Sequence, residues 1–282
     1  MLELEVGESI GWNQGGSQVY RARWQGREVV LKRHRELHKH ARERHGHLVW
    51  SHTGLLPELL HADAERLELL LEHIPALSAL GQPQTRAMYR TAGEALRRLH
   101  GAAPRGLIFD DGRGDVQSLM ARYLPRAQGV LPPEQVKWVE ATTRQLLNDP
   151  FPPTVLRHAD YTARNWLWDG ERLTVIDTEM ARPGPAVLDV AKMTKDLSAH
   201  ENSEALLNAF QDGYGREWTP DEAQFLQAVQ ALDALTLAVW CHRHDDPDGC
   251  MKMRGILNRL VPAPQRTLPL SSPPFPSRPA PH

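Results

Sequence analysis

The stretch that decides the fold covers residues 154–193 and reads TVLRHADYTARNWLWDGERLTVIDTEMARPGPAVLDVAKM. Two short apolar runs within it, residues 166–168 and 173–176, flank the dipeptide Asp169-Gly170. Asp-Gly between β-rich segments is a strong turn signal, so we expect the two runs to pair antiparallel as a β-hairpin.

Oxygen-bearing side chains come together at one end of this predicted hairpin. With a four-residue turn, Asn165 faces Ile176, and Asp177 stands beside Asn165. An amide oxygen and a carboxylate at one point suit Mg²⁺, a hard cation that takes a few protein oxygens and completes its octahedron with water and phosphate. Asp160 lies on the same loop, where a carboxylate can accept the proton of an attacking hydroxyl. Any one of these residues alone is explained as well by an Asp-rich turn, but their joint spacing favours a metal-assisted transfer site.

The motifs of this stretch resemble those of the aminoglycoside phosphotransferase and choline kinase-like family. His158, Asp160 and Asn165 form the pattern His-x-Asp-x-x-x-x-Asn, with the His-x-Asp order of that family rather than the His-Arg-Asp of protein kinases. Residues 176–191, IDTEMARPGPAVLDVA, resemble the family's Ile-Asp-x-Glu followed by an Asp-Leu-Ala-like element, and Asp-Phe-Gly is absent. The resemblance covers residues 11–260. It implies an α+β, bilobal protein-kinase-like fold, with a small β-rich N-lobe that carries one helix and a larger, mainly helical C-lobe.

The resemblance also implies roles for individual residues. Asp160 is the expected catalytic base, Asn165 and Asp177 are the expected Mg²⁺ ligands, and Asp189 is expected to brace the loop from below. Glu179 either reaches a second metal ion or is an ordinary surface residue.

Two further residues of the loop are expected to take part in catalysis. His158 is expected to brace the loop through hydrogen bonds rather than to titrate in the reaction. Arg164 stands where many relatives carry Pro or Gly before the Asn, and it is expected to contact phosphate or acceptor. This departure leaves open whether the acceptor is an aminoglycoside.

A nucleotide site is expected among the N-terminal strands. The Gly-rich residues 11–18, GWNQGGSQ, would let backbone N–H groups reach phosphates, although a Gly-rich turn explains them as well. Lys32 ends an apolar run, as the phosphate-pairing lysine of the kinase fold ends its strand, and its expected partner is Glu43, with Glu36 as the competitor. By resemblance, backbone groups of residues 72–74 would bond the adenine edge. The residues expected to contact the nucleotide are Gly15, Gly16, Ser17, Lys32, Glu43, Glu72, His73 and Ile74.

The pattern along the chain predicts three regions. Strands and one helix occupy residues 1–74, the nucleotide-binding lobe, and helical periodicity prevails in residues 75–261, the catalytic and acceptor-binding lobe. Residues 262–282 are Pro-rich and are predicted to be a disordered tail. Residues 102–133 are expected to form a surface loop and a short helix, while residues 219–222 read as a capping box that opens a long helix.

Two charged segments have competing interpretations. The acidic residues Asp245, Asp246 and Asp248 follow the predicted long helix. The resemblance implies that they line the acceptor site. The alternative is a solvated turn that ends the helix. Residues 32–47 are the most basic segment of the chain. We favour a solvated helix face there over a nucleic-acid contact or a metal-binding pair of His34 and His38.

Composition excludes several classes of protein. Thirty-three Lys and Arg against 35 Asp and Glu leave a formal charge of −2, which argues against wholesale nucleic-acid binding. Two cysteines, Cys241 and Cys250, are too few for a disulfide framework. The N-terminus lacks the pattern of a signal peptide, and no apolar run reaches membrane-spanning length. A cytoplasmic protein without nucleic-acid or membrane partners is expected, with a monomer favoured.

These features together predict an enzyme that transfers the γ-phosphoryl group of ATP to a hydroxyl of a small-molecule acceptor with Mg²⁺. Whether GTP replaces ATP stays open, and so does the choice among an aminoglycoside, choline, a macrolide, a sugar amine and homoserine. The alternatives are a protein Ser/Thr kinase-like activity and a non-catalytic nucleotide-binding scaffold.

Overall fold

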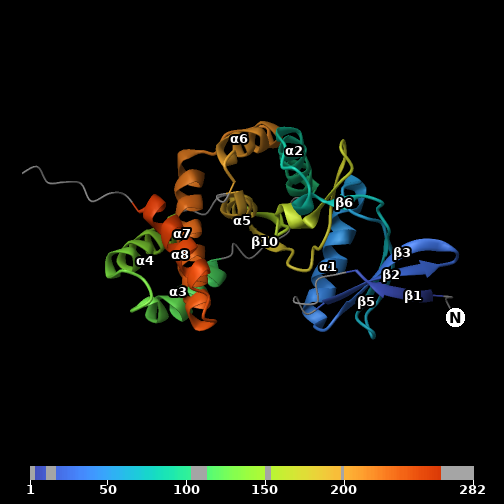
Figure 1. Ribbon diagram of the computed structural model, residues 1–282, viewed down its shortest axis with the longest axis horizontal. Coiled ribbons are helices and arrows are strands. Elements are labelled where there is room, and N and C mark those ends of the chain that lie inside the picture. The colour runs from blue at the N-terminus through green and yellow to red at the C-terminus, as the bar shows by residue number, and fades with distance from the viewer. Residues whose placement is uncertain (1–3, 11–16, 103–112, 150–153, 198–199, 262–282) are drawn as a thin grey trace, which may run out of the picture.

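The computed structural model describes residues 4–10, 17–102, 113–149, 154–197 and 200–261. Gly15, Gly16 and the Pro-rich residues 262–282 lie outside these ranges, so the expectations for them stay untested. Two lobes are seen in Figure 1, with the strands of the N-lobe on the right and the helices of the C-lobe at the centre and left. The fold is the α+β, kinase-like arrangement that the sequence predicts.

The N-lobe is a five-stranded antiparallel sheet with strand order β1-β2-β3-β5-β4 and one long helix, α1. Gln25 and Gly26 have φ of 52° and 76°, the left-handed geometry of a two-residue hairpin turn, so β2 folds directly back onto β3. Val29 and Leu31 of β3 pack in the small core of this lobe. Lys32, the next residue, therefore projects from the opposite face of the sheet. The bounds are β1 Leu4–Ser9, β2 Ser17–Trp24, β3 Arg27–His34, α1 Leu37–Trp50, the 3-10 turn η1 Ser51–Thr53, β4 Leu59–Asp63 and β5 Glu68–Glu72.

The C-lobe consists of helices around two small sheets, one with the strand order β6-β8-β9 and one that pairs β7 with β10. Its first elements are β6 Leu77–Ser78, η2 Ala79–Gly81, α2 Arg86–Ala102, α3 Arg113–Ala127, α4 Pro133–Asn148 and β7 Thr154–Arg157. They are followed by η3 Ala163–Asn165, β8 Trp166–Trp168, β9 Leu173–Val175, β10 Arg182–Pro185, α5 Val187–Leu197, α6 Ser203–Tyr214, α7 Pro220–Arg243 and α8 Pro247–Leu260.

Two apolar cores hold the C-lobe together. One gathers residues of α2, α5 and α6 around Trp166 and Phe210, and the other gathers residues of α3, α4, α7 and α8 around Leu235. The predicted capping box opens α7: the Glu222 N–H donates to Thr219 Oγ1 at 3.2 Å, and the Thr219 N–H donates to the Glu222 carboxylate at 3.1 Å.

Two parts of the C-lobe differ from the sequence-based expectation. The expected short helix is a helix of 15 residues, 113–127, because Val116 and Met120, one turn apart, are buried in the second core, and the expected loop before it falls largely on residues 103–112, outside the described ranges. The strand β10 was not predicted, since its sequence, RPGP, has little intrinsic β-propensity. It forms because its backbone pairs with β7, with Arg182 opposite Arg157.

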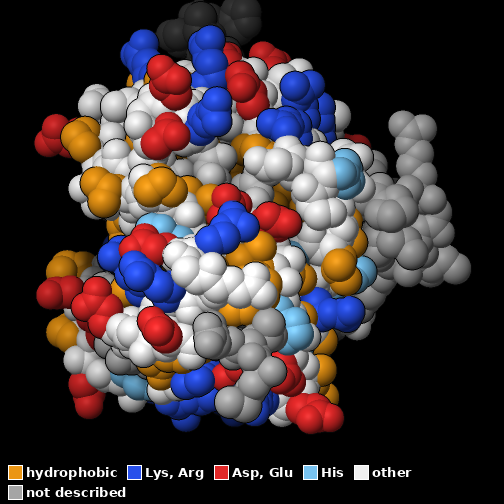
Figure 2. Space-filling model, turned by 90° about the vertical axis from the view of Figure 1, so that its right-hand side faces the viewer, with side chains coloured by type: hydrophobic (Ala, Val, Ile, Leu, Met, Phe, Trp, Pro, Cys, Tyr) orange, Lys and Arg blue, Asp and Glu red, His pale blue; other side chains and the backbone are white. Residues whose placement is uncertain are grey.

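The surface has mixed charge on the side where β1 lies. Figure 2 shows acidic and basic side chains interspersed over this face rather than one continuous basic surface. In the part of the chain that the structure describes, none of the helices has both the length and the apolar character needed to cross a membrane.

We predict that the contact between α2 and α6 depends on two glycines. A Cβ atom on Gly93 would overlap the Phe210 carbonyl, and one on Gly213 would overlap the Arg90 carbonyl. Replacing either by Ala should lower the free energy of unfolding by about 1–3 kcal/mol, because the helices must separate. Gly101 is the matched control, since an added Cβ there meets no atom within 4 Å. Gly101→Ala should stabilise the helix by about 0.5–1 kcal/mol. Urea unfolding of the three variants checks this, and equal effects at all three positions would contradict it.

Candidate active site

The predicted hairpin has the predicted register. Trp168 pairs with Leu173, and the Ile176 N–H donates to the Asn165 carbonyl at 3.0 Å, so Asn165 and Asp177 emerge together at the open end. The four-residue turn is closed by Asp169, whose Oδ1 accepts the N–H groups of residues 171 and 172. Local turn chemistry thus positions two oxygen-bearing side chains beside each other.

Asp160 is tied to this hairpin and to two cations. The Asn165 amide nitrogen donates to Asp160 Oδ2 and to the Asp160 carbonyl, both at 2.9 Å. Arg164 Nη2 bonds both carboxylate oxygens, at 2.8 and 2.7 Å, and Lys192 Nζ lies 2.5 Å from Oδ1. Burial alone would raise the pKa of Asp160, but Lys192 and Arg164 outweigh it and lower the pKa to about 2. Asp160 is therefore ionised at neutral pH.

Lys192 is a site residue that the sequence reasoning missed. It lies on α5, three residues after Asp189, and both side chains are directed toward the loop that carries Asp160. Residues three apart share a helix face, so the spacing from Asp189 could have indicated it.

The turn that precedes Asp160 is held by one buried carboxylate. Asp189 accepts the N–H of His158 at 2.9 Å and that of Ala159 at 2.7 Å. Ala159 has φ of 63°, a left-handed conformation that is costly for a residue with a Cβ, so the turn depends on such external bonds. Asp189 thus braces the loop from below, in the position that the resemblance implies.

A second layer of buried polar groups holds Asp189. His100 Nε2 lies 3.0 Å from Asp189 Oδ2, and His100 Nδ1 lies 2.9 Å from the Tyr214 hydroxyl. A carboxylate only accepts, so the proton of His100 lies on Nε2, and Tyr214 donates to Nδ1. Burial opposes the charge of Asp189, yet the hydrogen bond from His100 and nearby cationic and histidine groups keep its pKa below the usual value. Burial raises the pKa of Tyr214 to about 12, which keeps its donor proton in place.

His158 links the loop to the hairpin. Its Nδ1 accepts the Asp160 N–H at 3.3 Å, so its Nε2 carries the proton that bonds the Ile176 carbonyl at 3.0 Å. The ring also stacks on Trp50 of α1, with the planes 9° apart. These contacts occupy both ring nitrogens, as expected of a bracing residue.

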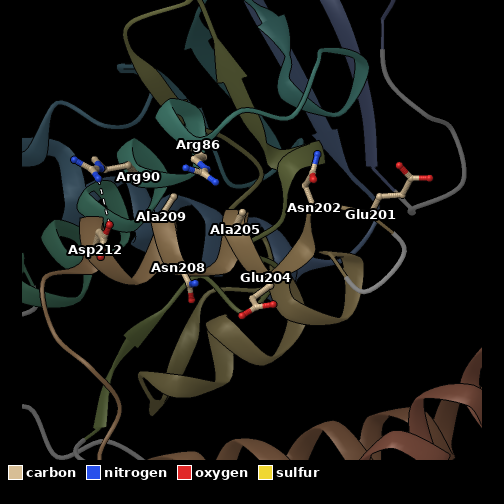
Figure 3. Close-up of a pocket in the computed structure, with 9 residues that line it drawn as sticks. All are labelled: Arg86, Arg90, Glu201, Asn202, Glu204, Ala205, Asn208, Ala209 and Asp212. Carbon is tan, nitrogen blue, oxygen red and sulfur yellow. Dashed lines mark hydrogen bonds and ion pairs between the residues drawn. The ribbon is translucent and has the colours of Figure 1, made fainter.

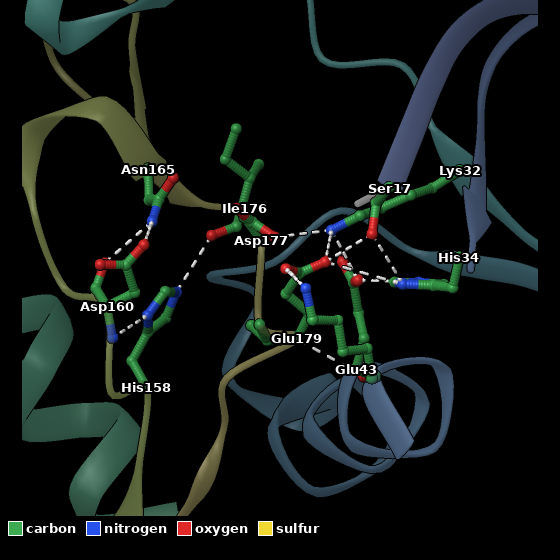
Figure 4. A network of polar contacts seen from close by, with 12 residues as sticks. Ser17, Lys32, His34, Glu43, His158, Asp160, Asn165, Ile176, Asp177 and Glu179 are labelled. Atoms are coloured by element: carbon green, nitrogen blue, oxygen red, sulfur yellow. Dashed lines mark hydrogen bonds and ion pairs between the residues drawn. The ribbon is translucent and has the colours of Figure 1, made fainter. Parts of the chain in front are cut away.

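Lys32 connects the N-lobe to the open end of the hairpin (Figure 4). Its ammonium lies 2.7 Å from Glu43 Oε2 and 2.6 Å from Asp177 Oδ1. Burial lowers the pKa of Lys32, but Glu43 and then Asp177 overcome this and leave it above the usual value. Glu43, rather than Glu36, is thus the helix carboxylate at Lys32, because it lies on the buried side of α1 whereas Glu36 is outside the helix, with a side chain 49% exposed.

Glu179 lies beside this ion pair rather than beside Asn165. It accepts a hydrogen bond from Ser17 Oγ at 2.7 Å and lies 3.3 Å from Lys39 Nζ. The disfavoured alternative, a metal-binding pair of His34 and His38 on one helix, does not form, because His34 ends β3 and is buried next to Glu43, whereas His38 is exposed. The contacts of Glu179 with Ser17 and with Lys39 connect the two lobes.

Asn165 and Asp177 have the donor atoms that Mg²⁺ requires. The Asn165 amide nitrogen is turned to Asp160, which leaves its oxygen directed away from that carboxylate. The Asp177 side chain is 37% exposed, and the described contact with Lys32 uses only its Oδ1. One amide oxygen and one carboxylate oxygen are a suitable set for a hard cation that keeps water and phosphate ligands.

The other expected site residues lie apart from this group. Glu72 ends β5, and the Ile74 carbonyl accepts the Ala76 N–H at 2.8 Å in the segment that connects the lobes, which also contains His73. Asp245 and Asp246 lie in the turn between α7 and α8, and Asp248 lies in the first turn of α8, which Asp246 caps by accepting the Gly249 N–H at 2.9 Å. No described contact joins Asp245, Asp246 or Asp248 to Asp160.

A hollow of about 490 Å³ lies between α2 and α6 (Figure 3). Its rim has both signs of charge, and Arg90 pairs with Asp212 across it at 3.2 Å. None of the expected site residues lines this hollow, so it is separate from the candidate active site.

Comparison with known proteins places the chain in a family. The sequence profile of the phosphotransferase enzyme family matches residues 10–226, and the chain belongs to this family. No functionally curated protein matches it.

Solved structures share the fold at low sequence identity. A choline/ethanolamine kinase family protein from Mesorhizobium loti is 22% identical over 90% of this chain and 86% of its own, with a TM-score of 0.64. The macrolide 2'-phosphotransferase MphH from Brachybacterium faecium is 21% identical over 93% of both chains, with a TM-score of 0.58. A thermostable mutant of aminoglycoside phosphotransferase APH(4)-Ia, in ternary complex with AMP-PNP and hygromycin B, is 17% identical over 91% of this chain and 94% of its own, with a TM-score of 0.69.

We predict that Glu43 makes the protein sensitive to acid. Burial opposes its charge, but Lys32 and His34 lower its pKa to about 2, whereas in the unfolded chain a Glu titrates near about 4.3. A carboxyl whose pKa is lowered on folding adds stability above the unfolded pKa, and this is lost as the pH falls through the folded pKa. The free energy of unfolding should therefore decrease between about pH 4.5 and pH 2 by up to about 1.4 kcal/mol per pH unit from this group. Urea unfolding at several pH values should show a shallower slope for Glu43→Gln, with the wild-type slope kept in the control Glu36→Gln. Equal slopes for Glu43→Gln and wild type would contradict the prediction.

Proposed function

We propose that this protein transfers the γ-phosphoryl group of ATP to a hydroxyl of a small-molecule acceptor with the help of Mg²⁺. The observation that carries the proposal is the grouping of Lys32, Asn165 and Asp177 around the end of one hairpin, with Asp160 bonded to the same Asn165. An ammonium, two metal-ligand oxygens and a carboxylate base are the parts that phosphoryl transfer requires. The AMP-PNP in the related ternary complex supports a nucleotide as donor.

In this proposal each side chain has one task. Lys32, positioned by Glu43, binds phosphate oxygens of the nucleotide, and Asn165 and Asp177 hold the metal ion. The bound Mg²⁺ would supply neutralisation of charge on the phosphate oxygens. Asp160 orients the acceptor hydroxyl and takes its proton while the acceptor oxygen forms a bond to the γ-phosphorus. The bond between that phosphorus and the β,γ-bridging oxygen breaks, and ADP leaves.

The low pKa of Asp160 indicates how it would act. A carboxylate with a pKa of about 2 is a weak base, so it cannot remove the hydroxyl proton before the attack. In a loose transition state the acceptor oxygen loses its proton late, when the bond to phosphorus is well formed. Orientation of the hydroxyl is then the main contribution of Asp160.

Replacing Asp160 by Asn is expected to lower turnover by roughly two to four orders of magnitude, because the amide neither orients the hydroxyl as a charged acceptor does nor takes its proton late in the transfer. The readout is ADP release with a panel of small alcohols, amino alcohols and a protein acceptor. Asp212→Asn on α6, whose side chain is 64% exposed, is the matched control and should keep full activity. Nucleotide binding by the Asp160 variant, measured by thermal shift, should be unchanged. Unchanged turnover in this variant would remove Asp160 from its proposed role, and a product with the protein acceptor alone would favour the protein kinase alternative.

Stabilisation by nucleotide is expected to depend on the metal ion. Mg²⁺ with AMP-PNP should raise the melting temperature more than AMP-PNP with EDTA, since a ligand that binds the folded state stabilises it. Asp177→Asn should remove most of this difference while retaining the smaller shift without metal. Asp169→Asn, in the turn at the other end of the hairpin, is the control. A metal-dependent shift of wild-type size in the Asp177 variant would exclude Asp177 as a ligand.

A further inference from the structure

The charge next to Asp160 is unusual for a site that receives a cationic acceptor. Arg164 and Lys192 both contact the single carboxylate of Asp160, so these three side chains have a net charge of +1. The Arg164 side chain is 55% exposed and that of Lys192 is 35% exposed, so both remain accessible from outside. An ammonium group brought to Asp160 would meet two cations, whereas an anionic group would meet two hydrogen-bond donors.

Other cations lie on the strands that lead into this site. Arg157 of β7 directly precedes the loop, and Arg182 of β10 lies opposite it in the two-stranded sheet. Arg157 is 5% exposed, and its Nε has no hydrogen-bond partner in the described part of the chain. Asp115 lies 3.4 Å from Arg182 and offsets part of this charge. The buried carboxylate of Asp189 also interacts with Arg157, so the charge of these strands is largely offset, and the excess positive charge at Asp160 comes from Arg164 and Lys192.

The acidic residues that the sequence offered for binding a cation are elsewhere. Asp246 uses one carboxylate oxygen to cap α8, Asp245 belongs to the same turn between α7 and α8, and Asp248 lies in the first turn of α8. In the described part of the chain, Asp160 makes ion pairs with both Arg164 and Lys192.

We propose that Lys192, together with Arg164, selects an acceptor that carries an anionic group, a carboxylate or a phosphate, close to the hydroxyl that is phosphorylated. This inference rests on the proposed function and names its acceptor class. The anionic group takes over the ammonium of Lys192 from Asp160 Oδ1. That oxygen then becomes available to accept the proton of the acceptor hydroxyl. Binding of the correct acceptor therefore also releases the carboxylate oxygen of Asp160 from Lys192.

Lys192 is the specificity-determining member of the pair. Arg164 immediately precedes the metal-ligand candidate Asn165, so it is also within the part of the loop that faces the nucleotide phosphates. Lys192 reaches Asp160 from α5, a separate element of the C-lobe. A change at Lys192 should therefore alter acceptor selection and leave nucleotide binding unaltered.

The test uses acceptors that differ in one substituent. D-glycerate, glycerol and 3-amino-1,2-propanediol form one series, with sn-glycerol 3-phosphate as the phosphate member. Glucuronate, glucose, 6-amino-6-deoxyglucose and glucose 6-phosphate form the second. ADP release gives kcat/KM for each acceptor and KM for ATP, and the melting temperature of the protein with Mg²⁺ and AMP-PNP gives acceptor binding without turnover.

In at least one series the wild type should prefer the anionic members to the amine by about 10-fold or more in kcat/KM, the effect of a hydrogen bond to a charged group. Lys192→Glu should lower kcat/KM for the anionic members by roughly 100-fold and reverse the order, with KM for ATP within about twofold. Lys192→Arg should restore most of the preference. The control Lys137→Glu, an exposed residue of α4, should match the wild type.

Four results would overturn the inference. The first two are a wild-type preference for the amines and an unchanged order of acceptors in Lys192→Glu. The others are an equal loss with all acceptors together with a raised KM for ATP, and the absence of any charge-dependent shift in both melting temperature and turnover. If no acceptor is phosphorylated but anionic members alone raise the melting temperature, the proposed phosphoryl transfer fails and the anionic site stands. A preference for the carboxylate or for the phosphate members identifies the natural anionic group.

Discussion

The two hydrogen bonds from the N–H groups of His158 and Ala159 to the carboxylate of Asp189 are the constraint on which the site depends. They hold a left-handed turn at a residue that has a Cβ, and that turn directs Asp160 toward Asn165. Asp189 is itself fully buried and is held by His100, which in turn accepts a bond from Tyr214. Burying an ionised carboxylate costs free energy unless hydrogen bonds compensate for the lost water. The network around Asp189 supplies these bonds and also specifies one arrangement of its groups.

A second constraint connects the lobes. Lys32 and Glu43 belong to the N-lobe, whereas Asp177 and Glu179 follow the C-lobe hairpin. Because Lys32, Glu43 and Glu179 are largely shielded from water, the attraction between Lys32 and these two carboxylates is stronger than that of surface ion pairs. Ser17, at the start of β2, is attached to the same cluster through Glu179. The N-lobe elements are therefore placed relative to the loop by charge as well as by packing.

The residues proposed for phosphoryl transfer differ from those proposed to select the acceptor. The parts proposed for phosphoryl transfer are those of the family to which the chain belongs, while the cations that contact Asp160 come from an Arg in the loop and a Lys on α5. Relatives of the same fold are named for choline or ethanolamine, for macrolides and for aminoglycosides, so the fold is compatible with several acceptors. Differences in acceptor on one fold arise from side chains rather than from the scaffold, and Lys192 is the side chain proposed for that role in this protein.

Local chemistry in the sequence determined the elements that depend on neighbours along the chain. Asp169-Gly170 is enough to predict the hairpin and its register, and Thr219 to Glu222 is enough to predict the start of α7, because turns and caps are made by residues a few positions apart. Only the tertiary structure decided which residues from distant segments of the chain contact one another. It paired RPGP as β10 with β7, buried His34 against Glu43 rather than placing it with His38, and brought Lys192 to Asp160. The physical reason is that backbone pairing and the meeting of charges depend on positions in space, which propensity and spacing along the sequence do not contain.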